Sequence, residues 1–329
     1  MKDKYRNGFL LFGVIAIVIM LCTFDMDYTD IWHSLRRAGA WFPAVLLLWL
    51  FVYILNTASW YLIIHDEGHC KGLGFWRVFK LSVSGFALNY MTPCGLMGGE
   101  PYRIMELTPY IGASKATSSV ILYVMMHIFS HFWFWLFSIL LFVLIYPVNL
   151  EIGILLFVIA CFCMVAIYFF ARGYRTGMTL KACTLLTRIP GIRRWARQFV
   201  KEKESTLRQI DEQIAMLHRQ HRRTFYCSLL LEFFARVLSS LEIYFILRAF
   251  STGISFADSV LILAFSSLFS NLIFFSPMQL GAREGGLALA AEGLHLSGAL
   301  GVYTGLITRV RELFWIAVGI LLIRIGNRK

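Results

Sequence analysis

The sequence is short of charge. Only 15% of its 329 residues are Asp, Glu, Lys or Arg, whereas 58% are hydrophobic and the mean hydropathy is +0.68. A soluble domain needs more polar residues than this to cover its surface, so the composition excludes an ordinary soluble globular protein. It is typical of a polytopic membrane protein.

Motifs of soluble enzymes are missing as well. The seven cysteines show no paired spacing of the kind that marks a zinc site or a disulfide framework, so we interpret them as buried free thiols. The sequence contains no nucleophile elbow, nucleotide-binding loop or zinc-enzyme spacing. It therefore predicts a protein that is not an enzyme and that carries no metal and no cofactor.

Long apolar runs dominate what is present. Crossing about 30 Å of hydrocarbon takes about 20 helical residues, and the runs of suitable length cover 8–24, 41–64, 116–146, 152–171, 224–250 and 299–325. The first run is not followed by a small-residue cleavage site, so we interpret it as a retained helix rather than a signal peptide. The predicted fold class is an all-α polytopic membrane protein, a single membrane domain over residues 1–329 with about six spanning helices.

Positive charge is concentrated in one loop. Residues 172–223 contain thirteen lysines or arginines against four acids, and the positive-inside rule places such a loop in the cytoplasm. Both termini then fall on the cytoplasmic side of a bacterial-type (inner) membrane. Leu207, Ile210, Ile214 and Leu217 recur at helical spacing, which predicts an amphipathic helix in this basic cytoplasmic loop. That helix either attracts anionic lipid headgroups or anchors the topology, and its charge gives no support for nucleic-acid binding.

Two polar breaks interrupt the apolar chain. "TPCGLMGGE" begins at Thr92 and "SPMQLGARE" begins at Ser276, and both fit the pattern Ser/Thr-Pro-x-x-Leu-x-x-x-Glu. Similar flanks extend the match to residues 81–146 and 259–325, which are related by a shift of 184 residues. In the topology above, the breaks face opposite sides of the membrane. This favours two oppositely oriented re-entrant, broken-helix units that form an inverted repeat, and two ordinary loops with shared turn chemistry are the alternative.

Each break is also expected to create a site for an anion. A helix that restarts after proline and glycine presents free N–H groups and the positive end of its dipole, and glycine lets a ligand approach the backbone closely. Gly98 and Gly99 are therefore predicted to contact a phosphate-containing headgroup.

At these residues the sequence resembles a known family. The stretches "PCGLMGGEPYR", "GASKATSSVILY", "LGAREGG" and "ALGVYTGLITRVREL" are similar to the membrane domain of the lysylphosphatidylglycerol synthase and flippase family, and the similarity covers nearly the whole chain. The best-known members also carry a soluble aminoacyl-transferase domain, which this sequence does not contain. The resemblance therefore implies a stand-alone membrane domain of that family.

The resemblance also implies a function in lipid transport. Such a flippase moves a phosphate-containing lipid between leaflets, and the implied substrate is an anionic or aminoacylated phospholipid or a lipid-linked glycan. A homodimer and a separate lipid-modifying enzyme stay open as protein partners. Two alternatives to a flippase are an integral membrane enzyme that modifies lipids and a structural subunit that recruits a cytoplasmic lipid-modifying enzyme.

Ionisable residues inside a membrane are costly, so each of them is a functional candidate. Arg103, Arg283, Arg309 and Arg311 are predicted to bind the headgroup phosphate, because a guanidinium binds phosphate in a bidentate geometry. Arg311 is the leading candidate. Arg309 shares a helical face with Glu312 at i, i+3, so those two charges can neutralise each other.

A second set is predicted to line the cavity or to couple transport to a cation: Glu100, Glu284, His127, His131 and Glu242. The glutamates of the two breaks either brace the arginines or cap the half-helices. The histidines share a helix face, but no carboxylate lies near them in the sequence, so no metal site is predicted. Glu232 and Arg236, at i, i+4, are expected to form an internal ion pair.

Overall fold

The computed structural model describes residues 36–66, 72–91, 98–176, 183–185, 187–188, 193–220, 222–250, 253–272 and 282–325. Almost all of these residues are helical, and this part of the chain contains no strand. The all-α prediction is therefore confirmed. The predicted helix over 8–24 and most of both breaks, 92–97 and 273–281, lie outside the described residues.

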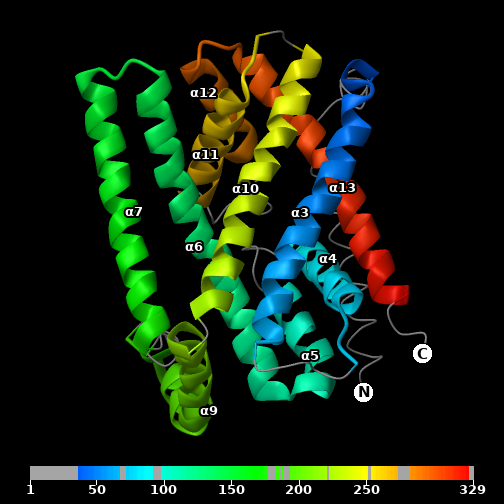
Figure 1. The fold of residues 1–329 in the computed structure, drawn as a ribbon, viewed down its shortest axis with the longest axis vertical. Coiled ribbons are helices and arrows are strands. Elements are labelled where there is room, and N and C mark those ends of the chain that lie inside the picture. The colour runs from blue at the N-terminus through cyan, green and yellow to red at the C-terminus, as the bar shows by residue number, and fades with distance from the viewer. Residues whose placement is uncertain are drawn as a thin grey trace.

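The helices of the described residues form a bundle (Figure 1). In chain order they are α3 (Trp41–Ile64), α4 (Phe75–Met91), α5 (Gly99–Ile111), α6 (Ala113–Ile145), α7 (Leu150–Thr176), α9 (Arg193–Gln220), α10 (Arg222–Phe250), α11 (Phe256–Leu272), α12 (Ala282–Gly293) and α13 (Gly298–Ile325).

Three of the described helices are long and apolar enough to cross a membrane by length and composition alone. They are α3, α6 and the segment Leu150–Gly173 of α7. α10 and α13 have 29 and 28 residues, which is also long enough to span, but both contain buried charges in their middle. The chain is accordingly an all-α polytopic membrane protein.

The two short helix pairs occupy opposite ends of the bundle. α4 and α5 lie in the lower half of Figure 1, near α9, whereas α11 and α12 lie in the upper half. At the lower end, the Arg77 guanidinium at the start of α4 lies 4.8 Å from the ring centre of Tyr110 at the end of α5. At the upper end, the Tyr146 hydroxyl beyond α6 donates to Asp258 at the start of α11 (2.7 Å). Each pair therefore begins and ends on one side of the bundle.

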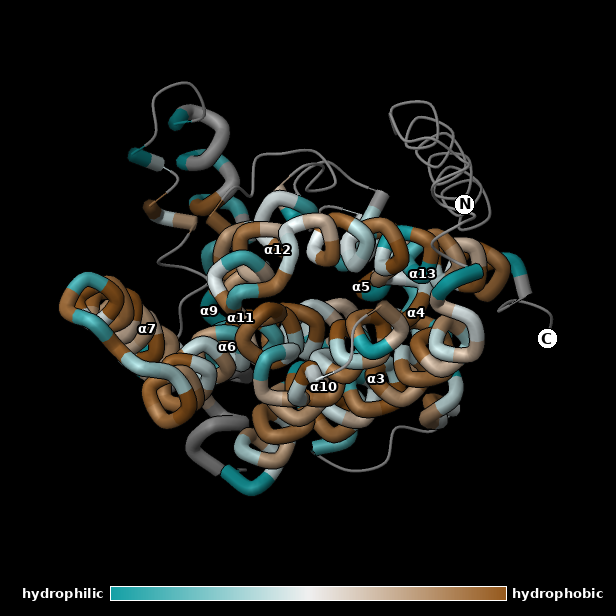
Figure 2. The backbone as a smooth tube through the Cα atoms, turned by 90° about the horizontal axis from the view of Figure 1, so that it is seen from above, coloured by the Kyte–Doolittle hydropathy of each residue, from teal (hydrophilic) through white to brown (hydrophobic). Residues whose placement is uncertain are grey.

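α3 and α10 run antiparallel and pack along each other. Ser59 and Ser228 connect them, because each hydroxyl donates to the other residue's backbone carbonyl, at 3.1 and 3.2 Å. Small side chains allow such close packing between membrane helices. Seen from above, α7 lies at the edge of the bundle (Figure 2), and most of its apolar side chains are exposed, as expected for a helix that faces lipid.

Gly112 separates α5 from α6. Its φ of +77° is in the region that residues with a side chain rarely adopt, and its N–H donates to the Thr108 carbonyl (3.0 Å). The chain therefore reverses direction here, and the short α5 returns into the long α6.

A buried arginine fills the space between α4 and α5. Arg103 is 2% exposed, and its guanidinium donates to the carbonyls of Leu81 (3.5 Å) and Ser82 (3.0 Å). It also lies over the ring of Trp60 on α3 and the ring of Tyr123 on α6. Arg103 thus joins four helices of the lower half.

Gly85→Ala is expected to destabilise the fold by about 1–3 kcal/mol, because overpacking of a filled interior forces side chains to move. A Cβ atom at Gly85 would lie 2.3 Å from Arg103 Nε. Thermal unfolding in detergent measures the effect. Gly74→Ala is the matched control, since a Cβ atom there meets nothing within 4 Å. Equal melting temperatures for the two variants would contradict this account.

Candidate functional site

Six ionisable side chains form a cluster inside the upper part of the bundle, here called the charge cluster. Its members come from α10, from the first turn of α12 and from the middle of α13: Glu242, Arg283, Glu284, Arg309, Arg311 and Glu312. Three arginines face three glutamates, so the formal charges of the cluster cancel.

Arg311 is held by Glu242 across the α10–α13 interface. Arg311 Nε donates to Glu242 Oε1 (2.8 Å) and Nη2 donates to Oε2 (2.9 Å), a bidentate arrangement. The indole N–H of Trp49 on α3 donates to the same carboxylate (2.8 Å), and the Arg311 guanidinium lies 3.7 Å from the Trp49 ring centre. Glu242, which has no partner in its own helix, therefore accepts hydrogen bonds from two other helices, from Arg311 on α13 and from Trp49 on α3.

Glu312 is the common neighbour of all three arginines. Its Oε1 accepts hydrogen bonds from Arg283 Nη1 and from the Tyr90 hydroxyl, and its Oε2 accepts from Arg309 Nη1 at 3.3 Å. Arg311 Nη2 lies 3.6 Å from Oε1. The predicted i, i+3 pairing of Arg309 with Glu312 is present in this structure.

Tyr90 connects the cluster to the other half of the chain. It is in the last turn of α4, just before the first break, whereas Arg283 and Glu284 are the last two residues of the second break and lie in the first turn of α12. Glu284 Oε1 accepts a hydrogen bond from Arg309 Nε at 2.8 Å. The end of α4 and the start of α12, one beside each break, thus meet at one cluster.

Exposure differs sharply among the arginines. The side chains of Arg309 and Arg311 are 3% exposed, whereas that of Arg283 is 24% exposed. Arg311, the leading candidate from the sequence, is buried, with its guanidinium paired to Glu242 and stacked on the Trp49 ring. Arg283 is the cluster arginine that an incoming ligand can reach most easily.

The first break has a polar site of its own. Asn89 on α4 donates to Glu100 Oε1 and accepts from the Gly99 N–H, both at 2.7 Å. Arg103 Nη1 lies 3.5 Å from Glu100 Oε1. A Cβ atom at Gly99 would lie 2.0 Å from the Gly85 carbonyl oxygen, so Gly99 lets α5 pack against α4. The first N–H of α5, predicted to be free for an anion, is therefore bonded to Asn89.

The histidines of α6 lie beside α10. His127 Nδ1 is 2.8 Å from Glu232 Oε2, and Arg236 Nη2 is 3.4 Å from His127 Nε2. The expected direct pair between Glu232 and Arg236 is replaced by an arrangement in which His127 bridges them. The ring of His131 is buried against His127, and its Nδ1 has no hydrogen-bond partner.

The charge cluster, the polar site at the first break and the histidines of α6 do not have the composition of a metal centre. In the described ranges, no group of three or more His, Cys, Asp or Glu side chains is placed to hold a metal ion. Guanidinium groups interleave with the carboxylates of the charge cluster, and such a set suits an anion better than a cation.

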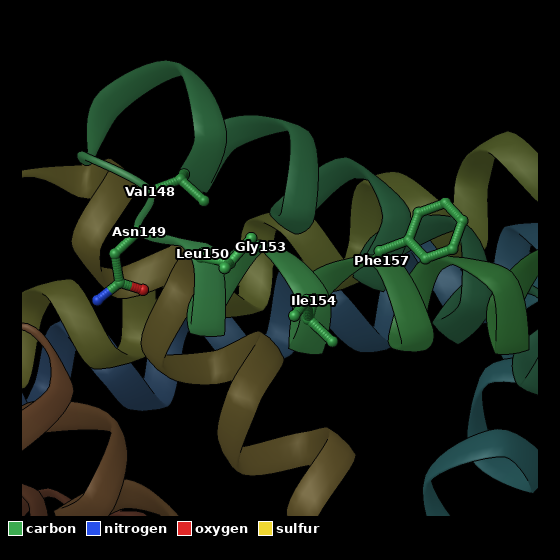
Figure 3. Close-up of a pocket in the computed structure, with 6 residues that line it drawn as sticks. All are labelled: Val148, Asn149, Leu150, Gly153, Ile154 and Phe157. Carbon is green, nitrogen blue, oxygen red and sulfur yellow. The ribbon is translucent and has the colours of Figure 1, made fainter.

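Two further features lie away from these sites. A hollow of about 530 Å³ at the α6–α7 turn is lined by Val148, Asn149, Leu150, Gly153, Ile154 and Phe157 (Figure 3), and it contains no charged group. α9 is the predicted amphipathic helix, and it packs on α6, α7 and α10 with Leu207 buried. The side chains of Ile210, Ile214 and Leu217 lie outside the described part of the chain.

Sequence reasoning missed Trp49 and Tyr90. Neither is charged, so neither drew attention as a costly group within the membrane. Trp49 does stand in the middle of its helix rather than near an end, where membrane tryptophans usually gather, and that position was a usable signal. Tyr90 stands next to Asn89 at the edge of the break.

The fold and the charge cluster together define a polytopic α-helical membrane protein with a polar site buried between its helices. The sequence profile of the lysylphosphatidylglycerol synthase transmembrane region matches residues 9–319, and the chain belongs to that family. Membership makes it a membrane protein involved in lipid modification or translocation, with a membrane lipid as its substrate. No curated protein and no solved structure gave a match.

Proposed function

We propose that this protein is a flippase that moves a phosphate-containing lipid between the leaflets of the membrane. The observation that carries the proposal is that three arginines converge on the buried Glu312 carboxylate. The end of α4 and the start of α12, one beside each break, both reach this carboxylate. Guanidinium groups recognise phosphate through paired N–H donors. Buried arginines inside a membrane protein commonly mark the pathway of a charged substrate.

The order of the helices supports an inverted repeat. Shifting α3, α4, α5 and α6 by 184 residues superimposes their ranges closely on α10, α11, α12 and α13. α3 and α10 run in opposite directions, and the short pairs lie at opposite ends of the bundle (Figure 1). We interpret α4–α5 and α11–α12 as re-entrant pairs whose breaks meet inside the membrane, a geometry that secondary transporters use for alternating access.

The contacts of two basic residues follow the same relation. His127 on α6 and Arg311 on α13 are separated by 184 residues; His127 pairs with Glu232 on α10, and Arg311 lies over the Trp49 ring on α3, the equivalent of α10. Each of the two therefore contacts the first helix of the other unit, as a twofold relation between the units requires.

Within this scheme, Arg283 makes the first contact with the headgroup phosphate. It is the most exposed arginine of the charge cluster, and it lies in the first turn of α12, where the helix dipole attracts an anion. The basic α9 then lies on the cytoplasmic side of the inner membrane, by the positive-inside rule.

Reconstitution tests this function. Purified protein in liposomes that contain a fluorescent, chemically reducible phospholipid is expected to expose inner-leaflet lipid to a reductant outside. Protein-free liposomes give the background rate. Modified lipid products without any translocation would support a lipid-modifying enzyme instead, and unchanged lipid without translocation would refute the flippase.

The topology makes a separate prediction for Ala113 and Ser297, which are related by the same shift and lie exposed before or at the start of α6 and α13. In a cysteine-free background, Ser297→Cys is expected to react with an impermeant maleimide in intact cells. Ala113→Cys is expected to react only after permeabilisation. Val148→Cys, at the α6–α7 turn, is the control and should behave like Ser297→Cys. Labelling of both test positions from one side would contradict the inverted repeat.

A further inference from the structure

The surroundings of Glu312 are those of a bound anion. One carboxylate receives hydrogen bonds from Arg283, Arg309 and Tyr90, and a third guanidinium, that of Arg311, lies 3.6 Å away. Carboxylate and phosphate accept the same paired N–H donors from arginine. A phosphodiester in this position would find the donors that Glu312 now uses.

The other two glutamates of the cluster have different surroundings. Glu242 is held by one arginine in a bidentate pair and by Trp49, and Glu284 bonds to Arg309 at the margin of the cluster with a side chain that is 18% exposed. Glu312 is 3% exposed and lies within 4 Å of all three guanidinium groups. Its carboxylate is therefore the anion that a phosphate must replace to reach all three.

Charge balance sets a condition on that replacement. The cluster contains three arginines and three glutamates, and an uncompensated charge in such a buried place costs several kcal/mol. Binding of a monoanionic phosphodiester adds one negative charge. Neutrality returns if one carboxylate takes up one proton from water, and Arg283, which is partly exposed, connects the cluster to the outside.

We propose that Glu312 is an internal anion that occupies the place of the headgroup phosphate, and that the lipid phosphodiester displaces it while Glu312 takes up one proton. The inference rests on the proposed flippase function and adds the mode of substrate recognition. The phosphodiester gains the hydrogen bonds from Arg283, Arg309 and Tyr90, and the neutral Glu312 carboxyl gives them up. No covalent bond between heavy atoms forms or breaks, and no electron is transferred.

The groups that face Glu312 come from every helix around it. α4 contributes Tyr90, α10 contributes Glu242, α12 contributes Arg283 and Glu284, and α13 itself contributes Arg309 and Arg311. α3 contributes Trp49, which donates to Glu242, and Tyr53, whose ring centre lies 5.7 Å from that of Trp49. Three positive guanidinium groups surround the Glu312 carboxylate in the absence of ligand, and a bound phosphate adds a negative charge beside it.

Binding of a short-chain, water-soluble phosphatidylglycerol to the purified full-length protein in detergent tests this. Uptake of one proton makes wild-type affinity fall by up to about tenfold for each unit rise in pH, over the range in which Glu312 is ionised without lipid and protonated with it. Glu312→Gln, which is neutral already, is expected to bind about tenfold or more tightly than wild type near pH 8, with a nearly flat pH profile. Glu292→Gln changes an exposed carboxylate at the other end of α12 and should keep the wild-type slope.

The possible outcomes separate the two proposals. A flat wild-type profile together with weaker binding by Glu312→Gln overturns the internal anion and leaves the flippase intact. Failure of the wild type to bind at any pH refutes the lipid site itself. Glycerophosphoglycerol, the deacylated lipid, keeps the single charge of the phosphodiester and distinguishes a lipid from a soluble phosphodiester: affinity equal to that of the lipid would assign the site to a soluble compound and overturn the lipid assignment.

The wild type alone also suffices if Glu312→Gln does not fold. Calorimetric titration of the same lipid in two buffers with different ionisation enthalpies counts the protons taken up on binding. The expected count is about one per lipid. A count near zero overturns the proposal.

Discussion

Arg311→Ala is expected to lower the stability of the folded protein by about 3–5 kcal/mol, because removal of one partner leaves a buried charge uncompensated. The partner is Glu242, whose carboxylate accepts hydrogen bonds from both Nε and Nη2 of Arg311. The Glu242 side chain is 5% exposed. The Trp49 indole would remain its main donor. Thermal or denaturant unfolding in detergent measures the loss.

A double variant distinguishes two causes of the lost stability, the uncompensated buried charge and the missing contact. Replacing both partners, as Glu242→Gln with Arg311→Gln, leaves no uncompensated charge on either side and is expected to recover most of the stability. Arg324→Ala, at the exposed last turn of α13, is the control and should change stability by less than about 0.5 kcal/mol. If the double variant is as unstable as the sum of the single variants, the pair does not act as described.

The sequence was sufficient for the helices and for most of the charged members of the site. Apolar length alone predicted α3, α6 and α7, because a membrane helix satisfies its own backbone and needs only a run of apolar residues. The cost of burying charge singled out Arg283, Arg309 and Arg311 without any knowledge of their contacts. Both inferences depend on local composition, which a sequence displays directly.

The pairing of those charges could not be predicted in the same way. Glu242 and Arg311 are 69 residues apart, and Tyr90 and Glu312 are 222 residues apart, so only the packing of α4, α10 and α13 brings them together. Local spacing was also misleading once. Glu232 and Arg236 satisfy the i, i+4 rule, yet His127 from α6 takes the place between them.

The proposed inverted repeat rests on two kinds of observation. The break motifs relate residues 81–146 to 259–325, and the order of the helices relates α3 to α10 by the same shift. Helix bounds and direction can preserve a relation that side-chain identity does not.

Arg283→Ala is expected to slow lipid translocation in liposomes by about 10–100-fold, the equivalent of losing a charge-assisted hydrogen bond worth about 1.5–3 kcal/mol to the substrate. The variant leaves two arginines against three glutamates, so stability falls as well, but by less than in Arg311→Ala. The side chain is 24% exposed, and Glu312 keeps Arg309 and Tyr90 as donors when Arg283 is removed.

This variant therefore differs in kind from Arg311→Ala. The Arg311 guanidinium is buried in a bidentate pair with Glu242 and contributes to the fold, whereas the Arg283 guanidinium is partly exposed at the start of α12 and is available to a ligand. Arg283→Lys keeps the charge but not the paired donors, so an intermediate rate is expected. Arg324→Ala should translocate lipid at the wild-type rate. A folded Arg283→Ala protein with unchanged translocation would remove Arg283 from the lipid path, and the phosphate site would then have to be sought beside Glu100 and Arg103.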